Sequence, residues 1–185
     1  MKKYELTAET KVVFGRTLHR IRALVAFGNV NAGELGGWIE KEDNLDHYGN
    51  AWVCDDARVC DNACVCDNAC VYGDADVYGN AEVYGDACVC GDACVYGNAR
   101  VYGAYAIMTV SNVGSRNDTT TFFARKDKQI GVTCGCFRGT IDEFEAAVKK
   151  THGDNEHGKV YMLAIEMAKL RINSRKNRRR KNELD

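Results

Sequence analysis

The middle of the chain alternates apolar and polar positions with a period of six residues. Residues 49–102 read GNAWVC, DDARVC, DNACVC, DNACVY, GDADVY, GNAEVY, GDACVC, GDACVY and GNARVY, which is nine hexads without an insertion. In each hexad Ala and Val stand two positions apart, so a short strand turns both to one side. The Gly or Asp and the Asn or Asp between strands tolerate left-handed and turn conformations. The pattern predicts short strands joined by tight corners.

Three such strands with three corners close a triangular coil, so each coil takes three hexads. Residue i then lies over residue i+18 at one strand spacing, ~4.8 Å. Columns such as Ala51, Ala69 and Ala87 fill a narrow core between the three sides. Because one coil cannot bury its apolar side alone, the coils must stack. The hexads therefore predict a parallel β-helix with hydrogen bonds running between coils.

Softer versions of the hexad flank the regular run. Gly37–Ile39 and Leu45 precede it, and Tyr105–Ile107 and Ser111–Val113 follow it. We therefore predict a mainly β protein whose single-stranded β-helix spans residues 31–114 in about four to five coils.

An N-terminal β cap is predicted over residues 1–30. Residues 19–25 alternate apolar and charged positions, and an earlier strand is expected near Lys11–Phe14. An uncovered first coil would leave backbone N–H and C=O groups unpaired, so we expect these strands to cover it.

A small α+β module is predicted over residues 119–172. After a polar linker at Ser115–Thr121, Phe122–Ala124 and Ile130–Val132 have the pattern of a hairpin. Thr140 and Glu143 form a capping-box signature for a short amphipathic helix. A second helix is expected from about Lys159 to Ile172, followed by a basic tail at 173–185.

The hexad V-[CY]-[GD]-[ND]-A-x resembles the repeat of left-handed parallel β-helix proteins of the hexapeptide-repeat class. This resemblance implies the left hand of the coil, since crossovers otherwise favour the right hand. The segment GELGGWIEKEDNL, the GNAxVYGDA units and the C-terminal module are similar to uncharacterised hexapeptide-repeat proteins of bacteriophages and prophages. The repeat also resembles that of YdcK-like putative transferases.

Composition places further bounds on the protein. The chain has 185 residues and a net charge of -1, so charge arguments must be local. No apolar run is long enough for a membrane span, and charged sequence follows Met1 instead of a signal core. We expect a cytoplasmic protein, in the host cytoplasm if a phage encodes it, with its ten cysteines reduced.

A catalytic role would follow from the resemblance to hexapeptide-repeat acyltransferases. These imply a histidine base in a cleft between the subunits of a trimer, near a bound acyl donor. No histidine lies in the regular hexads, and His47, at the start of the coil, is the candidate catalytic residue. A structural hydrogen-bonding role for His47 remains open.

Two columns are candidates for metal binding. Asp56, Asp74 and Asp92 would form a carboxylate column for a hard cation, or serve simply as corner residues. Cys70, Cys88 and Cys90 would gather on one outer face, as zinc ligands or through drift from Tyr by single codon changes. Cys134-Gly135-Cys136 lacks the two-residue spacer of zinc knuckles and thioredoxin-type motifs. We expect no bound cofactor.

Two further sets of residues suggest binding surfaces. A ligand or oligomer surface is predicted on the outer edges of the coil at Tyr72, Tyr78, Tyr84, Tyr96 and Tyr102. An anion-binding site for a nucleotide or nucleic acid is predicted in the tail at Arg175, Lys176, Arg178, Arg179, Arg180 and Lys181. A simply solvated tail is the alternative.

Three functions are compatible with these patterns. The first is a non-catalytic β-helix, a homo-oligomer and preferably a trimer, that sequesters a host small molecule, such as an anionic one, or engages a host partner. The second is an acyltransferase-like enzyme that uses coenzyme A. The third is a structural protein that polymerises through end-to-end stacking of coils.

Overall fold

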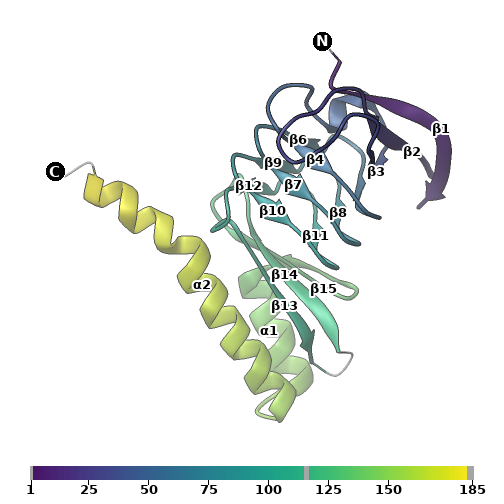
Figure 1. The fold of residues 1–185 in the computed structure, drawn as a ribbon. Helices are drawn as coiled ribbons and strands as arrows, with labels where there is room; N and C mark the ends of the chain where they lie inside the picture. Colours follow the sequence, from purple (N-terminus) through teal and green to yellow (C-terminus); the bar gives the residue numbers. More distant parts are fainter. Residues whose placement is uncertain (1, 115–116, 183–185) are drawn as a thin grey trace. The chain divides into compact units, whose positions relative to one another are not determined.

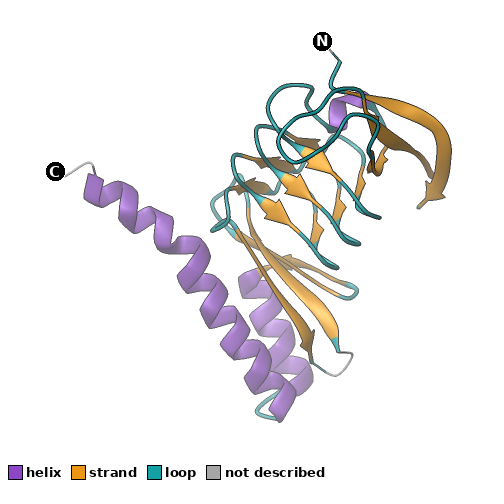
Figure 2. Cartoon of the chain, in the orientation of Figure 1, coloured by secondary structure: helices purple, strands orange, loops and turns teal. Residues whose placement is uncertain are grey.

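The computed structural model describes residues 2–114 and 117–182, without the side chains of 173–182. The chain divides into two compact units, Met1–Ala104 and Tyr105–Asp185. The first unit consists of a long hairpin, many short strands and a 3-10 turn, and the second combines a sheet with two helices (Figures 1 and 2).

The first unit is a parallel β-solenoid of about four turns, as the hexads predict. Its strands are β3 (Leu35–Ile39), β4 (Trp52–Val53), β5 (Arg58–Val59), β6 (Cys64–Val65), β7 (Cys70–Val71), β8 (Asp76–Val77), β9 (Glu82–Tyr84), β10 (Cys88–Val89), β11 (Cys94–Val95) and β12 (Arg100–Tyr102). They form three faces, β3-β5-β8-β11, β6-β9-β12 and β4-β7-β10. Val53 pairs with Val71 and Val71 with Val89, which confirms the predicted coil of three hexads.

The core of the solenoid consists of the alanines and valines of the hexads. Every one of them from Ala51 to Val101 is at most 1% exposed. Backbone N–H groups donate to the next coil, for example Cys64 N to Ala81 O at 2.9 Å. Small and β-branched side chains are required here because the three faces enclose a space too narrow for larger ones.

The corners depend on backbone with positive φ. Asp55, Asp61 and Asp67 adopt φ between 57° and 61°, and glycines occupy this position in the later hexads. Each aspartate carboxylate accepts the N–H of the glycine one coil further on, as in Gly73 N to Asp55 Oδ2 at 3.1 Å. This hydrogen bond offsets the strain of a left-handed non-glycine residue.

A second corner position forms a ladder of amides. Asn62 Nδ2 donates to Asn80 Oδ1 at 3.2 Å, and Asn80 Nδ2 donates to Asn98 Oδ1 at 3.4 Å. These asparagine side chains join successive coils at the surface of the solenoid.

The first coil is longer than the others. Trp38 pairs with Arg58 and Leu45 with Val65, so the partners are further apart in sequence than in the later coils. The paired residues of the first coil are 20 positions apart, two more than in the later coils. Val53 and Val71 are again 18 positions apart, so the two additional residues lie between Leu45 and Val53. The predicted hexads at Gly37–Ile39 and Leu45 do belong to the solenoid.

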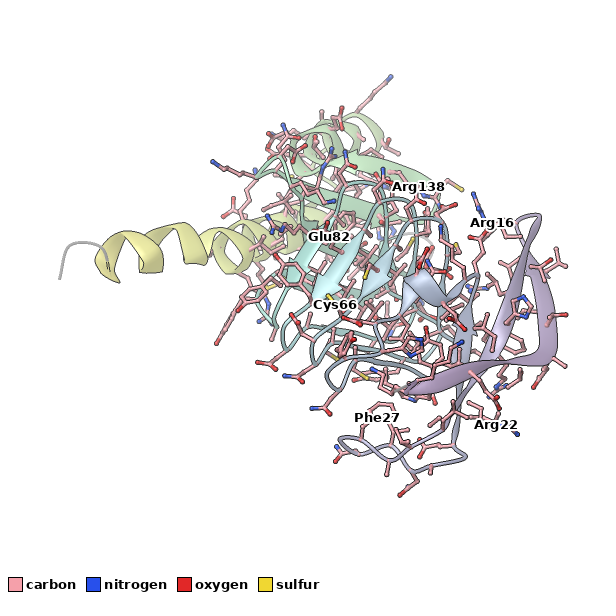
Figure 3. The ribbon with its side chains drawn as sticks, turned by 90° about the horizontal axis from the view of Figure 1, so that it is seen from above. Arg16, Arg22, Phe27, Cys66, Glu82 and Arg138 are labelled. Carbon is pink, nitrogen blue, oxygen red and sulfur yellow. The ribbon has the colours of Figure 1, made fainter. Side chains whose placement is uncertain are left out.

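An antiparallel hairpin caps the first coil, as the sequence predicts. β1 (Tyr4–Val13) pairs with β2 (Arg16–Ala23), and β2 pairs with β3, so the hairpin extends one face of the solenoid. Phe14 and Gly15 both have positive φ, as a type I′ turn requires. Arg16, visible on the hairpin in Figure 3, forms ion pairs with Glu40 and Asp61.

A buried amide caps the second face. Asn44, at the end of the short 3-10 helix η1 (Glu42–Asn44), has no exposed surface. Its Nδ2 donates to Ala63 O at 2.8 Å and Asp61 O at 3.2 Å, and its Oδ1 accepts from Lys41 N. The side chain thus supplies donors that a further strand would otherwise provide.

A buried lysine caps the third face. Lys3 is only 3% exposed, and its Nζ donates to Ala51 O at 2.8 Å. The ammonium group also lies 4.8 Å from the centroid of the Phe27 ring. Burial lowers the pKa of Lys3 to about 8.

The second unit is a four-stranded antiparallel sheet with two helices. Its elements are β13 (Ile107–Val113), β14 (Asp118–Ala124), β15 (Ile130–Cys134), β16 (Phe137–Thr140), α1 (Ile141–His152) and α2 (Glu156–Asn182). The predicted hairpin is confirmed, since Ala124 pairs with Ile130. The capping box is also confirmed, with Thr140 N donating to Glu143 Oε2 at 2.7 Å.

Three sequence-based boundaries differ from the structure. The hexads expected at Tyr105–Ile107 and Ser111–Val113 do not continue the solenoid, because β13 pairs antiparallel with β14. The run Ile107–Val110 has no Gly or Asp corner, so it extends as a longer strand. The expected linker at Ser115–Thr121 partly belongs to β14, and α2 continues beyond Ile172 through the basic residues.

The apolar sides of both helices close over the sheet of the second unit. Phe144 of α1 and Ile165 of α2 are buried against Phe122 and Val132. Ring contacts join these layers, with the Phe122 and Phe144 centroids 6.2 Å apart in an edge-to-face arrangement. The unit therefore has a hydrophobic core of its own.

Removing the amide cap should destabilise the solenoid. Asn44→Ala leaves the carbonyls of Asp61 and Ala63 without their donors, so we expect the free energy of unfolding to fall by about 2–3 kcal/mol. Asn80→Ala, at an exposed position of the amide ladder, should lower it by about 0.5 kcal/mol or less. Urea denaturation of both variants measures the difference. Equal losses would contradict the capping role of Asn44.

The lysine cap should make stability depend on pH. The unfolded chain keeps the Lys3 proton up to a pKa near 10.5, whereas the folded chain loses it near 8. The unfolded state therefore binds more protons in this window, and the contribution of Lys3 to stability rises with pH. The free energy of unfolding of the wild type minus that of Lys3→Met should increase by about 3 kcal/mol between pH 8 and 10.5.

Denaturation of both chains across this pH range, under reducing conditions, measures the difference. Lys2→Met changes the same charge at the preceding, exposed position and serves as the control. A difference between wild type and Lys3→Met that stays flat with pH would contradict the burial of the ammonium group.

Candidate functional site

A cavity of about 320 Å³ opens in the second unit between the sheet and the helices. Its apolar wall contains Phe137, Phe144 and Tyr161, with His152 beside them. The Phe137 and Phe144 ring centroids lie 5.0 Å apart, and those of Phe144 and Tyr161 lie 5.5 Å apart. His152 continues this series, with its ring 5.6 Å from Tyr161. The pocket is thus walled by four rings.

The turn between β15 and β16 forms another side of the pocket. Cys134 pairs with Phe137, which leaves Gly135 and Cys136 as a two-residue loop. Gly135 has φ of 55°, and a type II′ hairpin turn places glycine at this first central position. The turn leaves the Cys136 thiol exposed.

Polar groups accompany the rings of the pocket. Thr120 Oγ1 donates to Cys134 Sγ at 3.2 Å, and Tyr161 Oη lies 3.6 Å from the same sulfur. Asp118 also lines the pocket, and its Oδ1 accepts a hydrogen bond from Thr119 N at 2.8 Å. The site can therefore stack against a planar ring and offer acceptors to its edge.

No local sequence pattern indicates this pocket. Its lining comes from β14, β15, β16, α1 and α2, so residues far apart in the sequence meet in it. In the sequence, the Cys134-Gly135-Cys136 motif draws attention only through its thiols. Gly135 is typical of a two-residue hairpin turn, so the sequence could have indicated the hairpin between β15 and β16. It could not have indicated the pocket beside that hairpin.

The candidate catalytic residue His47 belongs to the cap. Its ring is stacked on Tyr4 at 4.4 Å between centroids, and Nδ1 accepts from Lys3 N at 3.3 Å. Glu42 Oε2 lies 3.9 Å from Nε2. These contacts support the structural interpretation of His47.

The tyrosines of the predicted ligand surface divide among three edges of the solenoid. Tyr78 stacks on Tyr96 with centroids 5.9 Å apart, and Tyr84 contacts Tyr102 at 4.9 Å. Tyr72 lies on the remaining face, where it is 37% exposed. Hexads that follow each other in sequence turn to different faces, so only tyrosines one coil apart meet.

The candidate metal ligands form columns without converging. Asp56, Asp74 and Asp92 are exposed at the corners, and Asp56 Oδ1 accepts from Trp38 Nε1 at 3.3 Å. Cys70 and Cys88 are direct neighbours in the register, as predicted. Within the described residues, no three His, Cys, Asp or Glu side chains are grouped to hold a metal ion.

Charged side chains on the outer faces of the solenoid form ion pairs with their neighbours in the adjacent coil. Arg58 binds Asp76 with two hydrogen bonds of 2.6 and 2.8 Å, and Arg100 Nε lies 3.6 Å from Glu82 Oε2. Both pairs join residues one coil apart, so they strengthen the stack of coils.

The predicted anion-binding residues fall on the last part of α2. The backbone of Arg175, Lys176, Arg178, Arg179, Arg180 and Lys181 is helical, and their side chains lie outside the described residues. Anion binding by this tail stays a prediction.

Comparison with known proteins adds no family to this picture. Neither the protein-family models nor the curated proteins contain a match to the chain. Within the described residues, neither helix has a stretch apolar and long enough to cross a membrane. The case for a function therefore depends on the geometry of the chain itself.

Proposed function

We propose that the protein is a non-catalytic binding protein, with the capped solenoid as a rigid scaffold and the pocket of the second unit as its ligand site. The observation that carries this proposal is the cavity of about 320 Å³ walled by Phe137, Phe144, His152 and Tyr161. Small-molecule sites in proteins have this character, a concave apolar wall with a few polar groups.

The pocket favours a small planar ligand. Its volume lies at the lower end of the range for ligand sites, ~300–1,000 Å³. Aromatic walls stack on flat rings, and the negative charge of the lining residue Asp118 disfavours an anion in the pocket. A neutral or cationic ring compound of nucleobase to nucleoside size fits these features better than the anionic ligand considered from the sequence.

The rival functions receive less support from the geometry. An acyltransferase needs a free histidine base beside the coil, whereas His47 is stacked on Tyr4 in the cap. Polymerisation through coil ends requires open ends, whereas the first coil is closed by β1, β2 and Asn44. The left-handed coil, the phage origin and the cytoplasmic location remain inferences from the resemblance and the composition.

Filling the pocket should abolish ligand retention. Ala147 of α1 lines the cavity, so Ala147→Trp places an indole in the space of the ligand. Ala146→Trp, at the neighbouring exposed position, is the matched control. Native mass spectrometry of protein purified from cells should show an added small mass on the wild type and on Ala146→Trp, and none on Ala147→Trp.

A titration with adenosine and with benzamidine, a neutral and a cationic ring compound, completes the test. Binding should be at least about tenfold weaker in Ala147→Trp than in Ala146→Trp. If the wild type retains no mass and binds neither compound, the pocket is not a site for this ligand class. Equal binding by both variants would place the site elsewhere.

We also propose that α2 mediates the predicted homo-oligomer. Val160, Leu163, Met167 and Leu170 are 37–75% exposed and follow each other at spacings of three, four and three residues. This is the spacing of a coiled-coil seam, and the opposite side of α2 already packs in the core. A second copy of α2 is the proposed partner, because each copy carries the same stripe.

Charges in this stripe should dissociate the oligomer. The Leu163→Glu and Leu170→Glu double variant introduces two negative charges per chain into the seam. Lys150→Glu changes the net charge equally at an exposed position of α1. Sedimentation equilibrium should give a monomer for the double variant, and the same oligomer for wild type and Lys150→Glu. A monomeric wild type would rule out this interface. A trimeric wild type would mean that three copies of α2, instead of two, pack together through this stripe.

A further inference from the structure

The rings that wall the ligand pocket meet at several different angles. Phe144 and Tyr161 are edge-to-face, with an interplanar angle of 85°. Phe137 is tilted by 50° from Phe144, and His152 is tilted by 36° from Tyr161. All four residues line the same cavity. A ligand in the pocket is therefore bordered by aromatic rings of different orientations.

This arrangement suits a flat ligand that carries positive charge. The face of an aromatic ring has a negative potential and its edge a positive one. Of the pair Phe144 and Tyr161, one ring directs its edge at the face of the other. A flat ligand that stacks on the first ring turns its own edge toward the same face. Positive charge on the ligand strengthens both contacts, because ring faces attract cations.

The charged residues of the lining favour the same sign of ligand. Among the described residues that line the pocket, Asp118 is acidic and none is a lysine or an arginine. Asp118 Oδ1 accepts the N–H of Thr119, which holds the side chain at the start of β14. The attraction between a carboxylate and a cation grows as a bound ligand displaces water from the space between them. Asp118 therefore stabilises a cation in the pocket.

Hydrogen bonds within the protein already involve several polar groups of the pocket. Thr120 Oγ1 donates to Cys134 Sγ at 3.2 Å, and Tyr161 Oη lies 3.6 Å from the same sulfur. A neutral polar ring is recognised mainly through hydrogen bonds to its edge. A cationic ring needs fewer of them, because ring faces and a carboxylate attract its charge without directional bonds.

We propose that the pocket selects a cationic heteroaromatic ring, such as an N-methylated pyridine or nucleobase, over the neutral ring of the same shape. This inference rests on the proposed ligand pocket and narrows its ligands from neutral or cationic rings to cationic ones. The aromatic walls supply the stacking contacts, and Asp118 supplies the opposite charge.

The test compares 1-methylnicotinamide, whose ring carries a permanent positive charge, with nicotinamide, the neutral ring without the methyl group. Isothermal titration calorimetry of the full-length protein at pH 8, at which free imidazole is neutral, measures both dissociation constants. The wild type should bind 1-methylnicotinamide at least about tenfold more tightly than nicotinamide. Equal affinities would overturn the proposal, and so would tighter binding of tetramethylammonium, a compact cation without a ring.

Asp118→Asn removes the charge and keeps an oxygen that can accept the N–H of Thr119. This variant should reduce the preference for the cation by at least about fivefold and leave the binding of nicotinamide unchanged. Asp127→Asn is the matched control, because Asp127 Oδ1 likewise accepts a backbone N–H, that of Gln129, and Asp127 lies outside the pocket lining. Circular dichroism verifies that both variants fold. A preference that stays unchanged in Asp118→Asn, or falls equally in Asp127→Asn, would also overturn the proposal.

Binding of adenosine separates this inference from the existence of the ligand pocket. If adenosine binds the wild type and not Ala147→Trp, while 1-methylnicotinamide has no advantage over nicotinamide, the pocket binds ligands and the charge selection is wrong. If adenosine, benzamidine and both nicotinamide compounds all show no binding, the ligand pocket and the charge selection are wrong together.

Discussion

The solenoid depends on the backbone hydrogen bonds that join each residue to its counterpart in the next coil. In the regular hexads these bonds repeat because every side has the same length and every corner turns by the same backbone conformation. Positive φ at Asp55, Asp61 and Asp67 and at the corresponding glycines satisfies this requirement. The buried Ala and Val columns follow from it, since only equal sides keep small residues in register.

A stack of this kind leaves backbone groups unpaired at its first coil. The chain satisfies them differently on each face, with the β1–β2 hairpin, the Asn44 amide and the Lys3 ammonium group. The cap also recruits His47 through its contact with Tyr4. A histidine that resembled a catalytic candidate therefore serves the closure of the fold.

The two units offer different kinds of binding surface for physical reasons. The solenoid separates neighbouring hexads and joins those one coil apart, so it produces flat ladders such as Arg58–Asp76 and Asn62–Asn80. The second unit has no repeat, and its helices close over an antiparallel sheet. A concave pocket forms there because side chains of different lengths meet at the edge of the core.

The sequence by itself determined the coil, the Ala and Val core, the hairpin of the second unit and the capping box at Thr140, because each depends on local spacing. It also placed Cys70 beside Cys88 through the regular period of the hexads. Only the tertiary structure decided that Ile107–Val113 leaves the solenoid. Whether this strand pairs parallel or antiparallel depends on which strand lies beside it, and here that strand is β14. The same holds for the pocket, which depends on side-chain packing between distant residues.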